Sequence, residues 1–155
     1  MAKTTMALLG DANWPSDTMP FYKKENVQIT GTMYPGYASY FESDGVVRPA
    51  LSGTAFGGVI GQSIGQEIDT VYTDQTYNVP HVPVQPHVEV PIYFDNAFTG
   101  VALLQGADLS LSTTAGKFSA TAETITGATM ILNKTIMKLS RPKAAGDIVG
   151  YGRFI

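Results

Sequence analysis

Residues 107–120 read Ala107-Asp-Leu-Ser-Leu-Ser-Thr-Thr-Ala-Gly-Lys-Phe-Ser-Ala120. Polar and apolar residues alternate in the first half of this stretch. This places Leu109 and Leu111 on one face of a strand, because side chains along a strand point alternately to opposite faces. Thr114-Ala-Gly116 then supplies turn residues before a second short strand begins at Lys117. A strand, a glycine turn and a second strand in this order predict a β-hairpin.

The composition extends the β interpretation to the rest of the chain. Val, Ile and Thr supply 39 of the 155 residues, and their branched side chains suit a pleated surface. The 16 Gly and 9 Pro residues interrupt the chain too often for long helices. We predict an all-β fold, a compact barrel or sandwich spanning residues 26–155, preceded by an extended N-terminal arm at residues 1–25.

Short apolar runs between turn residues mark the strands of this domain. The dipeptide Asp44-Gly45 adds a second hairpin signal, because both residues accept the positive φ angles of a tight turn. The sequence contains no tandem repeat. The predicted strands span residues 26–30, 37–42, 45–50, 55–62, 67–73, 88–94, 100–104, 107–113, 117–120 and 147–154.

Residues 128–140 are compatible with two structures. As a hairpin they would turn at Asn133-Lys134, and as a helix they would align Leu132, Ile136 and Leu139 on one face. A glycine before this segment and a proline after it leave little room for a capped helix. We therefore predict strands here.

The composition also excludes several classes of protein. Hydrophobic residues make up 44% of the chain and charged residues 15%, which excludes a wholly disordered chain. The net charge of −3 argues against a nucleic-acid partner. The chain has no cysteine for a disulfide, a thiol nucleophile or a zinc site. No apolar run approaches the ~20 residues of a membrane-spanning helix, so no membrane partner is expected.

Charge is distributed unevenly along the chain. Residues 1–116 carry 4 basic and 11 acidic residues, a net charge of −7, whereas residues 117–155 carry 6 basic and 2 acidic residues, a net charge of +4. We expect the basic residues to form a solvated face, since nothing in their spacing builds a phosphate site. Head-to-tail contact between subunits, with the basic segment against an acidic neighbour, is the alternative. The basic residues concerned are Lys134, Lys138, Arg141, Lys143 and Arg153.

Gly61-Gln-Ser-Ile-Gly65 matches the G-x-S-x-G pattern of a nucleophile elbow. In such an elbow the serine, here Ser63, sits on a sharp turn between a strand and a helix. Residues 66–73 are branched and strand-like, so no helix is predicted to follow the turn. We therefore interpret the glycines as bulges or close backbone approaches. A small esterase-like enzyme using Ser63 with His81 or His87 is the less favoured alternative.

The two histidines, His81 and His87, lie in a proline-rich stretch at residues 79–91. With Glu89 they could place three metal ligands on one face of an extended strand. Prolines at nearly every third position instead predict a polyproline or edge segment, because proline lacks the N–H that strand pairing uses. We expect structural histidines, no metal and no cofactor, with a proline-rich partner ligand as a third possibility.

Three neighbouring carboxylates also fail to indicate a reactive site. A calcium loop needs oxygen ligands at a tight spacing around a glycine, and that spacing is absent. Alternation along a strand predicts that these side chains face solvent. The residues are Glu67, Asp69 and Asp74.

Residues 1–25 contain turn residues and prolines but no sustained periodicity. They also carry large apolar anchors, including the single tryptophan, and burial of such groups is favourable. We expect this arm to lie on a surface, either that of its own domain or that of a neighbour. Its predicted partner-binding residues are Trp14, Met19, Phe21, Tyr22, Lys23 and Lys24.

Four sequence motifs share a pattern of short predicted strands and turn residues. They are Gly57-Gly-Val-Ile-Gly-Gln-Ser-Ile64, Val88-Glu-Val-Pro-Ile-Tyr-Phe94, the hairpin from Gly106 to Phe118, and Ala144-Ala-Gly-Asp-Ile-Val149. With them the sequence resembles the small head decoration, or capsid cement, proteins of tailed bacteriophages. The resemblance implies a non-enzymatic protein on the outer surface of the virion capsid, commonly a homotrimer. It also implies that the protein bridges subunits of the major capsid protein.

Two further classes are alternatives. Another phage structural β protein, from the tail, a fibre or the minor capsid components, would share the same composition. A carbohydrate-binding module would present an aromatic platform, for which packing within the β domain is the competing interpretation. The residues of such a platform would be Tyr37, Tyr40, Tyr72 and Tyr77.

Overall fold

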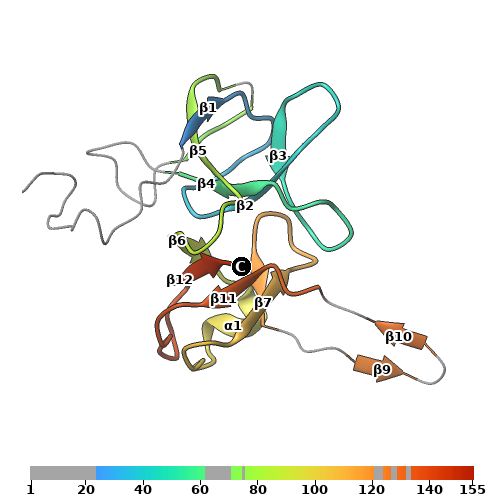
Figure 1. Ribbon diagram of the computed structural model, residues 1–155, viewed down its shortest axis with the longest axis vertical. Helices are drawn as coiled ribbons and strands as arrows, with labels where there is room; N and C mark the ends of the chain where they lie inside the picture. Colours follow the sequence, from blue (N-terminus) through green and yellow to red (C-terminus); the bar gives the residue numbers. More distant parts are fainter. Residues whose placement is uncertain (1–23, 62–70, 75, 121–123, 127–128, 132–133) are drawn as a thin grey trace, which may run out of the picture.

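The computed structural model describes residues 24–61, 71–74, 76–120, 124–126, 129–131 and 134–155. These residues form an all-β fold, as predicted, with two five-stranded antiparallel sheets one above the other and a two-stranded ribbon (Figure 1). The helix among them, α1 (Asn96–Thr99), spans four residues. Within the same residues no helix is long and apolar enough to cross a membrane. The predicted arm lies outside the described residues, except for Lys24 and Glu25.

The upper sheet of Figure 1, which we call half-barrel 1, is built from residues 25–83. Its strands are ordered β1-β5-β4-β2-β3, and a parallel bridge between Ile29 and Val47 brings its two edges together. The curled sheet encloses an apolar interior of Ile29, Met33, Val47, Ile60, Tyr72 and Val79. The strands are β1 (Glu25–Val27), β2 (Ala38–Phe41), β3 (Val47–Pro49), β4 (Gly58–Ile60) and β5 (Val79–Pro83).

The lower sheet, half-barrel 2, is built from residues 89–154. Its strands are ordered β6-β12-β11-β7-β8, and a parallel bridge between Phe94 and Phe118 again brings the edges together. The ribbon of β9 (Thr124–Thr126) and β10 (Thr129–Ile131) projects away from the sheet in Figure 1. The sheet strands are β6 (Glu89–Tyr93), β7 (Asp108–Leu111), β8 (Phe118–Ser119), β11 (Met137–Leu139) and β12 (Val149–Phe154).

The two half-barrels have the same topology. Matching the strands in chain order turns β1-β5-β4-β2-β3 into β6-β12-β11-β7-β8, which is the order observed. The register repeats as well, since His81↔Ile60 in half-barrel 1 corresponds to Gly152↔Leu139 in half-barrel 2. The isolated antiparallel bridges also correspond. They are Met33↔Tyr72 and Leu103↔Lys143.

One turn shows the repeat in its sequence. Gly36 has a φ of 100°, and its N–H donates to the carbonyl of Ile60 at 2.8 Å. Gly106 has a φ of 90°, and its N–H donates to the carbonyl of Leu139 at 2.7 Å. Glycine adopts such angles without strain, whereas side chains with a Cβ rarely do. The fold therefore occurs twice, with a glycine of positive φ at the same turn in each half.

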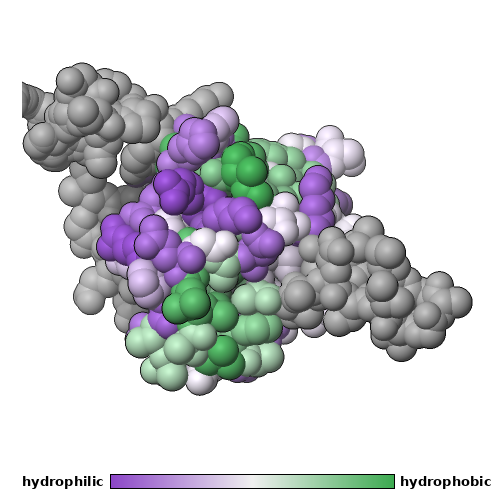
Figure 2. All heavy atoms as spheres, turned by 60° about the horizontal axis from the view of Figure 1, so that its bottom comes forward, coloured by the Kyte–Doolittle hydropathy of each residue, from purple (hydrophilic) through white to green (hydrophobic). Residues whose placement is uncertain are grey.

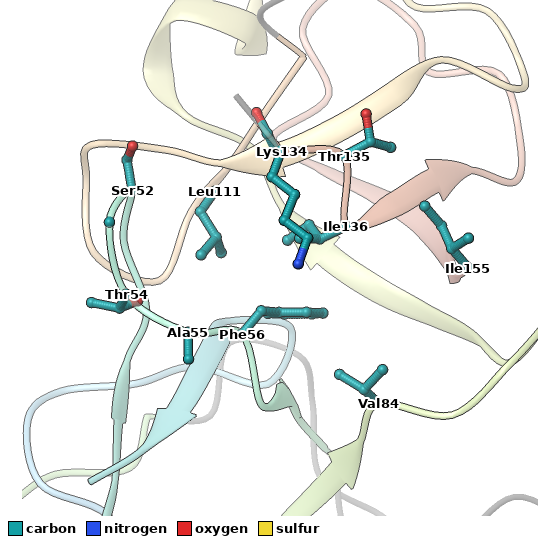
Figure 3. Close-up of a pocket in the computed structure, with 12 residues that line it drawn as sticks. Ser52, Thr54, Ala55, Phe56, Val84, Leu111, Lys134, Thr135, Ile136 and Ile155 are labelled. Atoms are coloured by element: carbon teal, nitrogen blue, oxygen red, sulfur yellow. The ribbon is translucent and has the colours of Figure 1, made fainter. Parts of the chain in front are cut away.

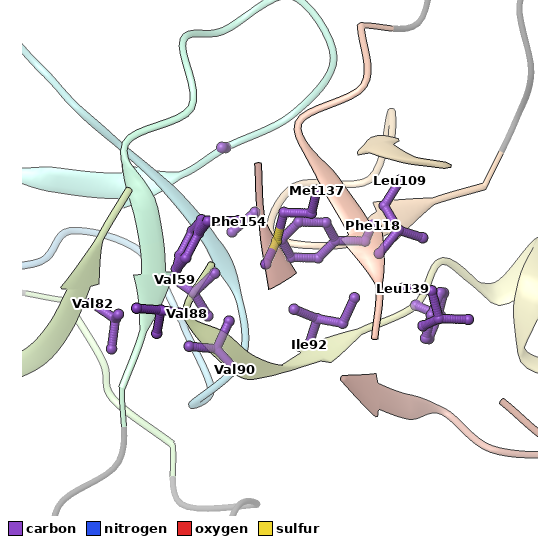
Figure 4. Packing of buried hydrophobic residues seen from close by; sticks show 13 residues of the cluster. Val59, Val82, Val88, Val90, Ile92, Leu109, Phe118, Met137, Leu139 and Phe154 are labelled. Atoms are coloured by element: carbon purple, nitrogen blue, oxygen red, sulfur yellow. The ribbon is translucent and has the colours of Figure 1, made fainter. Parts of the chain in front are cut away.

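Half-barrel 1 covers one end of half-barrel 2. Ala38, Val59 and Val82, on its outward face, belong to the same buried cluster as Met137 and Phe154 inside half-barrel 2 (Figure 4). Both faces of β4 and of the first four residues of β5 are therefore buried, whereas buried and exposed residues alternate along β11 and β12. Removal of this apolar face from water stabilises the pair of half-barrels as one unit.

The proline-rich stretch is not the edge segment that we predicted. Residues 79–83 form β5, which lies between β1 and β4 in the sheet. A proline cannot donate to a neighbouring strand, but its carbonyl still accepts. Pro80 accepts a hydrogen bond from the N–H of Gly61 at 2.8 Å. The other prolines of the stretch include Pro91 in β6, which does lie at the edge of its sheet.

Two further strand predictions need correction. Residues 100–104 form no strand and share only the bridge Leu103↔Lys143, because α1 turns the chain just before them. Strands do form at 129–131 and 137–139, but β10 pairs with β9, and β11 pairs with β7 and β12. The predicted hairpin at Asn133-Lys134 is therefore wrong, since periodicity gives the type of element but not its partner. The predicted strand at 67–73 lies mostly outside the described residues.

Candidate functional site

A row of three hydrogen-bonded side chains, those of Ser39, His81 and Glu25, crosses the interior of half-barrel 1, and we call it the polar chain. Ser39 Oγ lies 2.7 Å from His81 Nε2, and His81 Nδ1 lies 3.0 Å from Glu25 Oε2. Three strands position these groups, because Glu25 begins β1, Ser39 lies in β2 and His81 is the middle residue of β5. Ser39 and His81 are fully buried, and the Glu25 side chain is 29% exposed.

Glu25 determines which imidazole nitrogen carries the proton. An ionised carboxylate can only accept, so His81 Nδ1 donates to Glu25, and Nε2 accepts the hydrogen bond of the Ser39 hydroxyl. Burial lowers the pKa of His81 below its usual value, and the hydrogen bond to Glu25 opposes this shift in part. The arrangement therefore holds a neutral histidine at pH 7.

The order serine, histidine, carboxylate is also that of a serine hydrolase triad. A nucleophilic serine must reach its substrate, however, and Ser39 has no exposed surface. The ring of Phe41 stands edge-on to the imidazole of His81, with centroids 5.2 Å apart. Gly58 packs so closely against His81 that a Cβ there would lie 3.0 Å from the imidazole Cε1. The polar chain thus joins three strands, with Ser39 and His81 removed from solvent and Glu25 partly exposed.

Half-barrel 2 forms the same sheet without a polar chain. The positions equivalent to Glu25, Ser39 and His81 are held by Val90, Leu109 and Gly152. Buried polar groups are costly unless their hydrogen bonds are satisfied, and the fold does not need them here. The polar chain is therefore a particular property of half-barrel 1.

An exposed apolar surface lies at the end of half-barrel 2 that is remote from half-barrel 1 in Figure 1. Leu104 is 82% exposed, Ile148 is 56% exposed and Val101 is 42% exposed. Figure 2 brings this end forward and shows hydrophobic residues gathered on it. Exposed apolar patches rimmed by polar residues are typical of contact surfaces for other molecules.

Lys143 braces the two loops that form this apolar end, residues 99–104 and 143–148. Its side chain is buried, and Nζ donates to the carbonyls of Thr99, Val101 and Ala144 at 3.2, 2.9 and 3.1 Å. Three acceptors replace the water that the ammonium group loses on burial. Our expectation of a solvated basic face is therefore wrong for Lys143, which is part of the interior.

The other basic residues of the predicted face are exposed, namely Lys134, Lys138, Arg141 and Arg153. Lys138 pairs with Asp108 at 2.5 Å, and Arg141 pairs with Glu89 at 2.6 Å. Arg141 also lies over the ring of Tyr151, with its guanidinium carbon 4.0 Å from the ring centroid. These pairs lie at the surface, where such interactions contribute about 0–1 kcal/mol.

A groove of about 750 Å³ runs between the half-barrels (Figure 3). Phe56 and Val84 line it from one side, and Ile136 lines it from the other, where Lys134 also extends into it. Ser110 Oγ is buried in its wall and has no hydrogen-bond partner within the part of the chain that the structure describes. The groove suits an apolar group that carries a hydrogen-bond acceptor.

The histidines and Glu89 do not form a common site. His81 belongs to the buried chain, His87 is exposed between the half-barrels, and Glu89 pairs with Arg141. Among the described residues no group of three His, Asp or Glu side chains could hold a metal ion. Asp74 is exposed and accepts a hydrogen bond from the N–H of Gly31.

The tyrosines do not form one exposed platform. Tyr37 packs with Tyr34 and Tyr93, with ring centroids 5.4 and 5.3 Å away. Tyr72 is buried inside half-barrel 1, whereas Tyr77 is 65% exposed. Packing within the β domain is therefore the interpretation that fits Tyr37 and Tyr72.

Only one of the predicted partner-binding residues lies within the described part of the chain. Lys24 is described and exposed. The remaining arm anchors, the nucleophile-elbow serine and two carboxylates lie outside the described residues. They are Trp14, Met19, Phe21, Tyr22, Lys23, Ser63, Glu67 and Asp69.

Sequence reasoning missed the buried polar chain. Its members lie 42 and 56 positions apart along the chain, so no local motif contains them. The only local signal was a histidine between apolar residues in a strand-like run, which we interpreted as structural.

No family model matches the sequence, and no curated protein matches it. The features that bear on function are therefore those of the chain itself. They are a largely buried polar chain, an exposed apolar end and a groove between the half-barrels.

Proposed function

We propose that this chain is a virion structural protein, a decoration or cement protein that binds the outer surface of an icosahedral head and bridges subunits of the major capsid protein. The observation that carries the proposal is the exposed apolar end of half-barrel 2, where Leu104 is 82% exposed on a loop braced by buried Lys143. Removing such a surface from water by covering it with another protein is favourable. The motifs that resemble bacteriophage head decoration proteins supply the identity of that partner.

The N-terminal residues add a second contact in this proposal. Trp14, Phe21 and Tyr22 are aromatic anchors of the kind that dominate interface energetics. Glu25 follows them closely and is bound to His81. The polar chain of half-barrel 1 thereby ties the start of β1, next to these anchors, to the sheet.

The test uses capsid shells that lack the protein, with binding measured by cosedimentation. We expect Leu104→Glu to weaken binding at least about tenfold, because it places a charge in the apolar contact. Tyr77→Glu is the matched control, since Tyr77 is a large exposed side chain on half-barrel 1, 65% open to solvent, and should tolerate the change. Native binding by the Leu104→Glu variant would contradict the proposal, because the exposed apolar end would then not be the contact surface.

The contribution of the arm needs its own variant. Because β1 begins at Glu25, a deletion of residues 1–23 preserves the His81 partner. We expect this deletion to weaken shell binding while the circular dichroism of the β domain stays unchanged. Electron microscopy of labelled virions would distinguish the head from the tail, a fibre or a minor capsid component.

The order of Ser39, His81 and Glu25 favours a second candidate function, hydrolysis of an ester through Ser39 in place of Ser63. Full burial of Ser39 opposes it, because the hydroxyl would need a route to substrate. A fluorophosphonate probe tests this directly. Labelling that disappears in Ser39→Ala would support a hydrolase, and an unlabelled native protein would leave the structural role as the better proposal.

A further inference from the structure

Within the described part of the chain, the repeated topology leaves two surfaces without the partner that their equivalents have. Half-barrel 1 covers an end of half-barrel 2, so one outward face and one end are occupied within the chain. The corresponding end of half-barrel 1 and the corresponding outward face of half-barrel 2 are both exposed. Their side chains indicate what could cover them.

Backbone hydrogen bonds define the contact within the chain. The end of half-barrel 2 that carries the β7–β8 turn receives the outward face and the β3–β4 loop of half-barrel 1. Ala38 N–H donates to the carbonyl of Gly116 at 2.9 Å, and Gly116 N–H donates to the carbonyl of Ala50 at 2.7 Å. Ser52 N–H donates to the carbonyl of Ser112 at 2.7 Å. The turn of half-barrel 2 is thus bound directly by half-barrel 1.

The equivalent end of half-barrel 1 carries the β2–β3 turn, and no other described segment covers it. Phe41 is 44% exposed, and the side chain of Glu25 is 29% exposed. Three carboxylates lie at this end, those of Glu25, Glu42 and Asp44. Two basic residues are also described beside them: Arg48 pairs with Asp44 at 3.3 Å, and Lys24 precedes Glu25. Acidic residues outnumber basic ones by one among these five, so this end is acidic on balance.

The equivalent outward face of half-barrel 2 is charged where that of half-barrel 1 is apolar. By the register of the sheets, the buried residues Ala38, Val59 and Val82 correspond to three exposed charged residues. These are Asp108, Lys138 and Arg153.

The balance of charge on this face is positive. Its basic residues outnumber its acidic residues by one, and Arg153 lies opposite Glu89 in the register of β12 and β6. The charged residues of the face are Lys138, Arg141, Arg153, Asp108 and Glu89.

We propose that the outward face of half-barrel 2 binds the acidic end of half-barrel 1 of a second copy, and so repeats between molecules the contact that joins the half-barrels within one. Two observations favour a second copy. The docking geometry already exists within the chain, and each open surface carries a charged residue where its covered equivalent has an apolar one. Glu25 lies where half-barrel 2 has Val90, and Lys138 lies where half-barrel 1 has Val59. A basic face against an acidic end is electrostatically complementary.

Such a contact joins two different surfaces, so association closes into a ring or continues as a chain. Residues 24–84 carry 2 basic and 6 acidic residues, a net charge of −4, whereas residues 86–155 carry 6 basic and 5 acidic residues, a net charge of +1. The attraction acts between the two contacting surfaces and is screened by salt. It needs no capsid shell, so it stands or fails separately from the proposed function.

The first measurement is the mass of the purified full-length chain in solution. Sedimentation or light scattering from about 1 μM to about 1 mM should show a mass that rises with concentration at low salt. The same series in about 0.5 M salt should show weaker association, because the charges are then screened. A chain that stays monomeric at every concentration would overturn the proposal.

A charge swap then identifies the surfaces. Lys138→Glu with Arg153→Glu makes both surfaces of the chain acidic, and Glu42→Lys with Asp44→Lys makes both basic. Neither variant alone should associate, since like charges would meet. An equal mixture of the two should associate, because each surface then finds one of opposite charge.

Ala145→Glu provides the control, because Ala145 is exposed at the far end of half-barrel 2 and belongs to neither surface. It should associate like the native chain. Circular dichroism checks that each variant is folded, and Arg153→Glu alone replaces the double variant if that one unfolds. Association that persists in both reversed variants would assign the contact to other surfaces and overturn the proposal.

Discussion

His81 and Lys143 are both buried, and each is stabilised by groups that are distant in sequence. His81 contacts Ser39 and Glu25, and Lys143 reaches three backbone carbonyls. Without these partners a buried polar side chain would cost several kcal/mol. The sequence displays the type of each residue, but the set of partners decides whether that residue is a ligand, a surface charge or an internal brace.

At this scale we expect His81 to make stability depend on pH. Burial lowers its pKa in the folded state, so the unfolded chain, with an ordinary value of about 6.5, binds the proton first as pH falls. The contribution of neutral His81 to the free energy of unfolding is fully present above about pH 6.5. It is lost as pH falls from there toward the lower pKa of the folded state.

Urea unfolding midpoints between about pH 5 and about pH 7.5 measure the effect. In His81→Gln the urea midpoint should fall less between about pH 7.5 and about pH 5 than in the native chain, because Gln does not titrate. His87→Gln is the control, since His87 is exposed and lies outside the polar chain. Identical pH profiles for His81→Gln and the native chain would contradict the prediction.

Strand β12 shows how a single element meets two environments. Tyr151 and Arg153 point outward and are exposed, whereas Gly150, Gly152 and Phe154 are buried on the inward side. At Gly150 and Gly152 the side chains of other strands leave no room for a Cβ unless a neighbouring side chain shifts. The strand could be predicted from its alternation, but the reason for its glycines lies in residues from other strands.

We expect Gly150→Ala to lower the free energy of unfolding by about 1–3 kcal/mol through overpacking. A Cβ at this position would lie 2.6 Å from Phe94 Cε2 and 3.3 Å from Phe94 Cζ, in a ring that is itself buried. Gly100→Ala is the matched control, because a Cβ there meets nothing within 4 Å and its φ is −88°. Urea denaturation compares the two, and an equal loss of stability in both would refute the packing explanation.

Element predictions succeeded where the signal is local. The β2–β3 and β7–β8 hairpins form around Asp44-Gly45 and Thr114-Ala-Gly116, as the turn residues indicate. The prediction for β5 failed because proline statistics describe a strand edge, whereas tertiary packing placed this segment in the sheet interior. Pairing of β11 with β7 and β12 had no local signal at all.

At the scale of the whole molecule, the two half-barrels share one buried cluster and should unfold together. Val59 lies in half-barrel 1, yet it packs in the cluster that fills half-barrel 2. We expect Val59→Ala to lower the free energy of unfolding by about 2 kcal/mol, since it leaves a cavity in this shared core.

Hydrogen exchange should then accelerate in β11 and β12 as well as in β4, because the transition is cooperative. Val71→Ala is the control, since Val71 is 45% exposed, and it should change stability by less than about 0.5 kcal/mol. Faster exchange confined to half-barrel 1 would show that the half-barrels unfold separately.

The sequence by itself determined the all-β class and the two tight hairpins. These properties depend on the composition or on residues adjacent in the chain, whose alternation and turn preferences act locally. Only the tertiary structure decided that one fold occurs twice, that Ser39, His81 and Glu25 meet in half-barrel 1, and that Lys143 is internal. Each of these depends on partners that are distant in sequence, such as those 42 and 56 positions apart in the polar chain. A local pattern carries no information about which distant strand will supply the contact.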